Sequence, residues 1–130
     1  LQRDLFLEMN YLIILRQPVS ALESYEIELN FLQRLAVLAK EESDAKVQAI
    51  FFTDRAVTIS SDDVAVIPQH KAIQEKLIEL KDKLQCELLV CGRAFKNAAI
   101  SSEKLNSNFT LSGNFELSSM IATADRVIEF

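Results

Sequence analysis

Short apolar runs alternate along this chain with longer stretches in which apolar residues recur every three or four positions. The runs Tyr11–Leu15, Val47–Phe52 and Leu88–Cys91 consist mainly of apolar residues. Such runs are typical of strands that are covered on both faces of a sheet. The stretches 22–40 and 73–84 have the spacing of amphipathic helices. Strands that alternate with helices predict an α/β fold with a largely parallel sheet and helices on both faces.

Local signals add boundaries and further elements to this pattern. Ser20, followed three residues later by Glu23, has the pattern of a capping box, so we expect the first helix to begin there and to extend to Lys40. The polar stretch 53–69 is interpreted as a loop with a short turn, although residues 64–67 have the composition of a strand. The remaining predictions are a short helix over 93–99, a brief strand over 109–111, a helix over 114–124 and a closing strand over 126–130.

Size and charge restrict the classes of function. The chain has 130 residues and is interpreted as a single domain over 1–130, with Leu1–Glu8 ahead of Met9 as an extension without a functional role. Its formal net charge is −5, which argues against direct, non-specific binding of nucleic acid because such binding depends on basic patches. No apolar stretch approaches the roughly 20 residues that span a bilayer, so no association with a membrane is expected.

The two cysteines, Cys86 and Cys91, are five residues apart. An odd separation on one strand directs two side chains to opposite faces, so we expect no disulfide between them and a location in the reducing cytoplasm. Cys86 is interpreted as a small buried apolar residue. With His70 as the only histidine, the cysteines make a poor zinc site, and we expect His70 at the rim of the sheet opposite Cys91.

Cys91 has a different context, because it ends an apolar run and Gly92 follows it. Binding sites in open parallel sheets form beyond the carboxyl ends of the strands. Backbone N–H groups at the start of the next helix, together with Arg93 and Lys96, can favour the thiolate over the thiol. We therefore expect an exposed and easily ionised sulfur at this position. From these residues alone, a buried strand-end thiol without a role is an equally good interpretation.

Several segments together resemble the DsrE/TusD family. They are Phe109–Gly113, Ala124–Phe130 at the end of the chain, Phe51-Phe52 followed by a polar loop, and Leu88–Cys91 after a long helix. The resemblance extends over roughly residues 10–130. It implies a DsrE-like three-layer α/β/α sandwich with a five-stranded, mostly parallel sheet.

The resemblance also implies a role for particular residues. It identifies Cys91 as the cysteine that accepts sulfane sulfur as a persulfide and passes it to another protein, which is a sulfurtransferase activity that needs no metal or organic cofactor. The supporting residues are Gly92, Arg93 and Lys96, which would stabilise the anion together with backbone N–H groups, and Ser112 and Gly113, which would shape the neighbouring loop.

Partners and pathway are implied only in outline. TusD-like members act in the thiolation of a tRNA wobble uridine, and DsrE-like members act in the oxidation of intracellular sulfur. The expected partners are proteins that donate and accept sulfur, and related subunits that form a homo- or hetero-oligomer, commonly a hexamer. Two alternatives stay open: a non-catalytic partner subunit of a DsrEFH/TusBCD-like complex, and a small-molecule-binding domain that uses the crevice at the strand ends.

Overall fold

Five parallel strands form one sheet in the order β4-β3-β2-β1-β5. The computed structural model describes residues 9–42 and 45–130, so the interpretation of Leu1–Glu8 as an extension, and residues 43–44 of an expected turn, lie outside the described residues. The strands are β1 (Met9–Leu15), β2 (Ala45–Phe52), β3 (Glu87–Cys91), β4 (Phe109–Ser112) and β5 (Arg126–Glu129). The helices are α2 (Leu22–Glu42), η1 (Asp54–Ser60), η2 (Asp62–Val66), α3 (Pro68–Leu84), α4 (Gly92–Asn97), η3 (Ser102–Lys104) and α5 (Asn114–Thr123).

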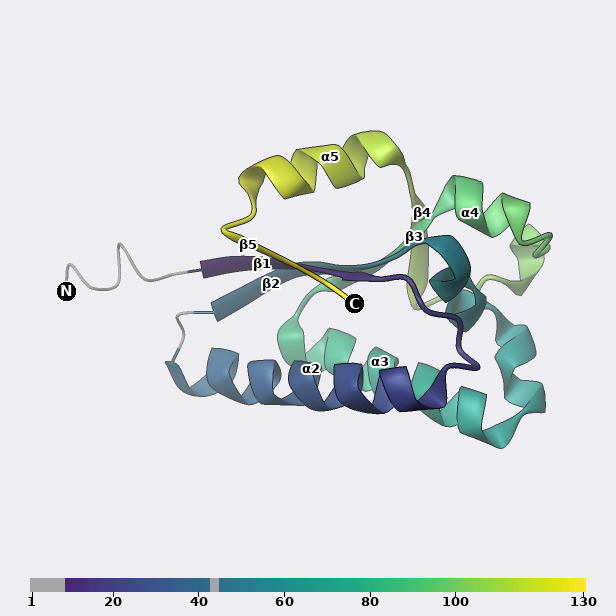
Figure 1. The fold of residues 1–130 in the computed structure, drawn as a ribbon, viewed down its shortest axis with the longest axis horizontal. Helices are drawn as coiled ribbons and strands as arrows, with labels where there is room; N and C mark the ends of the chain where they lie inside the picture. Colours follow the sequence, from purple (N-terminus) through teal and green to yellow (C-terminus); the bar gives the residue numbers. More distant parts are fainter. Residues whose placement is uncertain (1–8, 43–44) are drawn as a thin grey trace.

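The predicted α/β/α architecture is confirmed. Helices α2 and α3 lie side by side on one face of the sheet, and α5 crosses the other face on its way from edge strand β4 to edge strand β5 (Figure 1). Each strand buries its alternate residues against one of these two layers because successive side chains of a strand point to opposite faces.

The two faces of the sheet bury very different amounts of apolar side chain. The larger cluster lies under α2 and α3 and includes Ile13 and Phe52 together with Leu32 of α2 and Leu77 of α3, all fully buried. The smaller cluster lies under α5. Its six buried residues are Leu12, Ile14, Ala49, Phe51, Leu89 and Cys91, from the three central strands. Helix α5 itself has no buried residue. The α5 layer is therefore the thinner of the two.

The segment between β2 and α3 contains no strand, as predicted, but it is more ordered than a loop. It forms the two 3₁₀ helices η1 and η2, and the Ser61 hydroxyl between them accepts a hydrogen bond from the Asp63 N–H at 3.1 Å. The buried Gln74 amide of α3 donates to the carbonyl groups of Ile59 and Ser61, at 2.8 and 3.1 Å. Because these bonds join residues far apart in sequence, local patterns do not predict them.

The predicted start of the first helix is wrong. Helix α2 begins at Leu22, and the Ala21 carbonyl accepts a hydrogen bond from the Tyr25 N–H at 3.1 Å. Among the hydrogen bonds of the described residues, the Ser20 hydroxyl accepts none from the Glu23 N–H, and the Glu23 carboxylate accepts none from the Ser20 N–H. A turn in which the Ala21 N–H donates to the Pro18 carbonyl at 2.9 Å delays the helix, so the capping box does not form.

Candidate functional site

Cys91 lies at the carboxyl end of β3, immediately before the first residue of α4. Only 6% of the residue is exposed, so the expectation of an exposed thiol is wrong. Leu89 and Cys91 alternate onto the face of the sheet that α5 covers. Three partly buried residues of the α5 segment pack against the cluster that contains Cys91: Leu117, Met120 and Ala124. Ala94 of α4 packs against the same cluster. The layer formed by α4 and α5 thus covers the cluster that contains Cys91, which local sequence predicted to be exposed.

The backbone position of Cys91 agrees with the sequence prediction, whereas the exposure of Cys91 does not. Cys91 occupies the N-cap position of α4 in an extended conformation, and its side chain makes no capping hydrogen bond. The N–H groups of the first turn of a helix have no partner within the helix. They lie next to the cysteine in sequence and carry partial positive charge, although α4 is only six residues long.

The structure brings three of the expected supporting residues close to Cys91. Cys91 and Ser112 are partners in the parallel register of β3 and β4, and Gly113 follows as the N-cap of α5. A β-carbon on Gly92 would lie 3.4 Å from the Ser112 carbonyl oxygen, which is close to the limit of ordinary contact. The start of α4 therefore lies close to the end of β4.

Arg93 and Lys96 are exposed on α4. Neither takes part in an ion pair with a residue of 9–42 or 45–130. Two positive charges therefore lie within five residues of Cys91 in sequence, and no carboxylate in the described part of the chain forms an ion pair with them. Their proposed contribution to the stability of a sulfur anion stays a prediction.

Cys86 lies just before β3 and is 8% exposed. It packs in the cluster under α2 and α3, on the opposite side of the sheet from Cys91, as the odd separation predicted. Both cysteines are free. Burial raises the pKa of the Cys86 thiol to about 12, so this sulfur stays protonated at neutral pH. Cys86 has the environment of a buried apolar residue.

The predicted position of His70 is wrong. His70 lies in the first turn of α3, which the chain enters from η2 after the carboxyl end of β2. A helix that connects parallel strands begins near the carboxyl end of the first strand and returns to the amino end of the next. His70 is therefore at the same end of the sheet as Cys91, but on the layer formed by α2 and α3.

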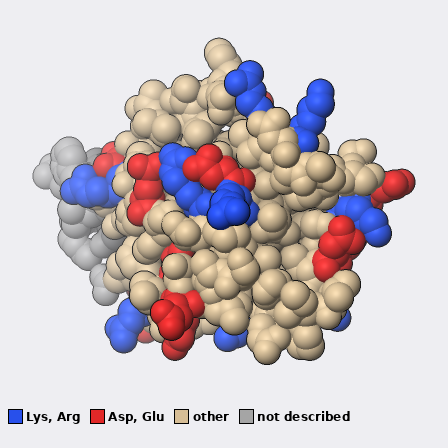
Figure 2. All heavy atoms as spheres, turned by 45° about the vertical axis from the view of Figure 1, so that its right-hand side comes forward, with Lys and Arg blue, Asp and Glu red and all other residues tan. Residues whose placement is uncertain are grey.

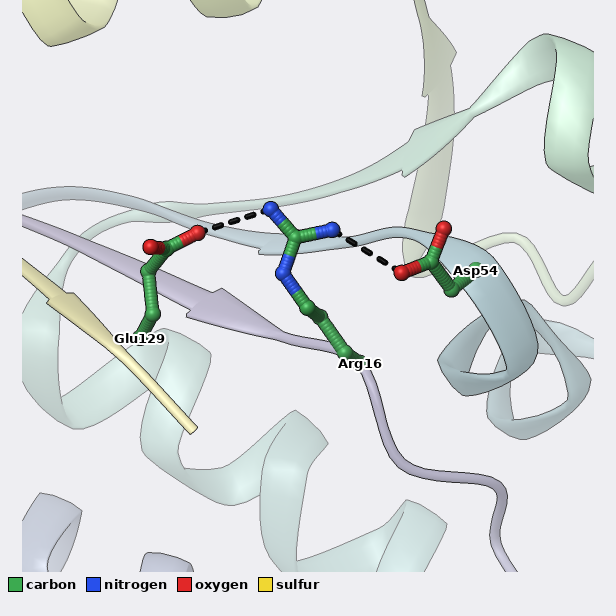
Figure 3. A network of polar contacts seen from close by, with 3 residues as sticks. All are labelled: Arg16, Asp54 and Glu129. Carbon is green, nitrogen blue, oxygen red and sulfur yellow. Dashed lines mark hydrogen bonds and ion pairs between the residues drawn. The ribbon is translucent and has the colours of Figure 1, made fainter.

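A charged network that sequence reasoning missed connects three elements at the carboxyl ends of the strands. Arg16, directly after β1, donates a hydrogen bond to Asp54 of η1 at 2.9 Å and to Glu129 of β5 at 2.7 Å (Figure 3). These bonds to Glu129 and Asp54 raise the pKa of Arg16. All three side chains are largely exposed, so each pair contributes little to stability. The signal in the sequence that could have indicated this network is an arginine directly after a buried strand.

A cavity of about 510 Å³ lies at the same end of the molecule. Its lining comes from the connection between β1 and α2, from η1 and from α4, and includes Ser20, Arg55 and Asn97. Ala94 lines this cavity and also packs against the cluster that contains Cys91. The cavity is the part of the structure that corresponds to the strand-end crevice of the small-molecule alternative.

Charge on the surface near this end is mixed. Figure 2 shows basic and acidic side chains interleaved on the face that it presents, with broad areas of uncharged residues between them. Within 9–42 and 45–130, no group of three or more His, Cys, Asp or Glu side chains has the arrangement of a metal site. No described helix is long and apolar enough to cross a membrane.

Comparison with known proteins identifies the family. The model of the DsrE/DsrF-like family matches residues 9–130, which is nearly the whole chain. This chain belongs to the DsrE/DsrF-like family. The family is associated with sulfur relay, which agrees with the resemblance derived from Phe109–Gly113 and Ala124–Phe130. No curated protein matches the chain.

Two solved structures share the fold of this DsrE/DsrF-like protein. The YchN protein from E. coli is 19% identical with a TM-score of 0.66, and the match covers 95% of this chain and 99% of YchN. A protein of unknown function from Methanobacterium thermoautotrophicum, MTH1491, is 10% identical with a TM-score of 0.61, and the match covers 93% of this chain and 97% of that protein. At these identities the similarity shows the fold alone.

Proposed function

We propose that this protein is a cytoplasmic sulfur-relay subunit in which Cys91 carries sulfane sulfur as a persulfide. The observation that carries the proposal is a cysteine at the carboxyl end of β3, at the N-cap of α4, in a chain of the DsrE/DsrF-like family. Neither a metal nor an organic cofactor is needed. The pathway served is the thiolation of a tRNA wobble uridine or the oxidation of intracellular sulfur, and the partners are donor and acceptor proteins in an oligomer with related subunits.

The chemical steps require only thiols. The Cys91 thiolate attacks the outer sulfur of a donor persulfide; a new S–S bond forms at Cys91, the S–S bond of the donor breaks, and the donor leaves as a thiolate. An acceptor thiolate then attacks the outer sulfur on Cys91, which leaves as a thiolate in turn. The thiolate is the reactive species in both steps. The exposed Arg93 and Lys96, and the N–H groups of the first turn of α4, would favour the anionic forms.

Burial of Cys91 sets a condition on this chemistry. With 6% of the residue exposed, a donor persulfide has little access to the sulfur in this conformation. The α5 segment packs against the cluster that contains Cys91, and we infer that transfer involves a displacement of this helix, whose residues are all at least partly exposed. The same burial favours a second candidate function, in which Cys91 is unreactive and the chain is a non-catalytic partner subunit.

Mass spectrometry after incubation with glutathione persulfide tests the carrier function. We expect an adduct with the mass of one sulfur atom that a reductant removes. The adduct should disappear in Cys91→Ser and persist in Cys86→Ser, because Cys86 has a pKa of about 12 and faces the opposite layer. An adduct on neither cysteine, with the protein folded, would exclude the carrier function.

The rate of alkylation by iodoacetamide, measured against pH in Cys86→Ser, separates the two candidates. A carrier cysteine should be alkylated readily at neutral pH, because the thiolate is the nucleophile. Alkylation that is slow at neutral pH and becomes measurable only in strongly alkaline buffer would favour the non-catalytic subunit.

A further inference from the structure

A groove on the α2 face of the sheet is separate from the Cys91 site. Its floor is formed by Tyr11 of β1 and Ile128 of β5, near the β5 edge. Tyr11 is the register partner of Arg126, and Ile13 is the register partner of Ile128, so these side chains alternate onto the same face of the sheet. Cys91 faces the other layer. The groove is therefore not part of the proposed sulfur chemistry.

The wall of the groove is apolar and comes from α2. Phe31, Leu35 and Leu38 line it at the spacing of one helix face, and Leu35 is buried whereas 43% of Leu38 is exposed. The cavity volume is about 440 Å³, which is within the range of small-molecule sites, roughly 300–1,000 Å³. Its size and open side suit a single aliphatic chain better than a lipid with two chains.

Two arginines from different elements line the same groove, Arg34 of α2 and Arg126 of β5. Both are exposed, and among residues 9–42 and 45–130 the ion pairs use other cations, Arg16 and Lys104. Arg126 donates to the Asp125 carbonyl at 3.0 Å through one nitrogen, so its other N–H groups can still donate. In a chain with a net charge of −5, this groove combines an apolar surface with positive charge that no carboxylate of the described residues pairs.

We propose that the groove binds an unbranched aliphatic carboxylate. The tail lies on Tyr11 and Ile128 against the α2 wall, and Arg34 and Arg126 hold the carboxylate. A planar guanidinium matches a carboxylate in geometry and charge, and an aliphatic chain is the complement of an apolar recess. The proposal does not depend on the function proposed for Cys91.

Isothermal titration of the full chain with decanoate tests the proposal, with decanol as the neutral analogue. We expect saturable, one-site binding of decanoate, and about a hundredfold weaker binding of decanol because the charge-assisted interactions with both arginines are lost. Arg34→Gln and Arg126→Gln should each weaken decanoate binding about tenfold. Lys76→Gln, on the exposed face of α3, is the matched control and should leave the affinity unchanged.

A second variant tests the apolar wall without a change in charge. Leu38→Asn is tolerated by the fold because Leu38 is 43% exposed, and it should weaken decanoate and decanol alike. The proposal is overturned by absence of saturable decanoate binding, or by equal affinity in wild type and both arginine variants. If decanoate fails to bind and Leu38→Asn also converts an oligomer into monomers, the groove is instead occupied by a second copy of the chain.

Discussion

At the scale of single residues, the buried Glu28 departs from the ordinary behaviour of a carboxyl group. This glutamate of α2 is 2% exposed, and its Oε1 atom has no hydrogen-bond partner among the described residues. Burial raises the pKa of Glu28 from 4.5 to about 7. Burial and, to a smaller extent, the charge of Glu28 raise the pKa of Tyr25. A carboxyl group that lacks a partner is destabilising when it is charged, so its protonation state affects the stability of the fold.

Glu28 predicts a loss of stability as the pH rises. Its pKa is higher in the folded than in the unfolded chain, so its stabilising proton is fully present below pH 4.5 and is lost as the pH rises through about 7. The free energy of unfolding should fall by up to about 3 kcal/mol across this window, and Glu28→Gln should remove the fall. Urea unfolding between pH 4.5 and 8 measures this fall in the free energy of unfolding. Glu26→Gln changes an exposed neighbour and is the control. If the free energy of unfolding of Glu28→Gln depends on pH as it does in the wild type, Glu28 is not the group responsible.

At the scale of elements, the sequence and the structure agree where a pattern is local. The apolar run of β3, Leu88–Cys91, and the spacing of Leu77, Leu80 and Leu84 in α3 predict those elements because burial on a sheet imposes the periodicity. The candidate site depends instead on contacts between elements. Residue spacing in α5 does not predict which strands the helix crosses, and its residues pack against the cluster that contains Cys91.

Helix α5 should control access to the Cys91 thiol. Leu117→Ala removes part of the packing of α5 on the smaller cluster. Because Leu117 is only partly buried, we expect the free energy that holds α5 in place to fall by about 1.4 kcal/mol. The equilibrium constant for displacement of α5 should then rise about tenfold. In a Cys86→Ser background, alkylation of Cys91 by iodoacetamide should become about tenfold faster at constant pH.

Leu77→Ala in α3 is the matched control for that measurement. Leu77 is fully buried in the larger cluster, so this change should lower the global free energy of unfolding by about 2–5 kcal/mol without faster alkylation of Cys91. If the alkylation rates of both variants follow global stability instead, the thiol is reached only by complete unfolding and α5 is not a gate.

At the scale of the whole molecule, aromatic contacts hold the layers and edges of the sheet together. Phe52 of β2 and Phe109 of β4 meet edge to face with ring centroids 5.5 Å apart, and both are buried. Near the other edge, Phe31 of α2 and Phe130 meet at 5.6 Å but are only partly buried. The contact near β4 should therefore contribute more to stability than the contact near β5.

This difference predicts an order of stabilities. Phe109→Ala should lower the free energy of unfolding by about 3–5 kcal/mol, the usual cost of a buried phenylalanine, and Phe130→Ala should cost clearly less because its ring is partly exposed. Urea unfolding of both variants gives the comparison. Equal losses of unfolding free energy in the two variants would contradict this order of stabilities.

The sequence by itself determined the α/β class, the order of strands and helices, and the position of Cys91 at a strand end, because periodicity and turn residues reflect burial that each element undergoes separately. Only the tertiary structure decided that α5 packs on the cluster that contains Cys91, that His70 lies at the same end of the sheet, and that Arg16 joins Asp54 and Glu129. Those outcomes arise from contacts between residues far apart in the chain, and no local pattern encodes which distant surface a side chain meets.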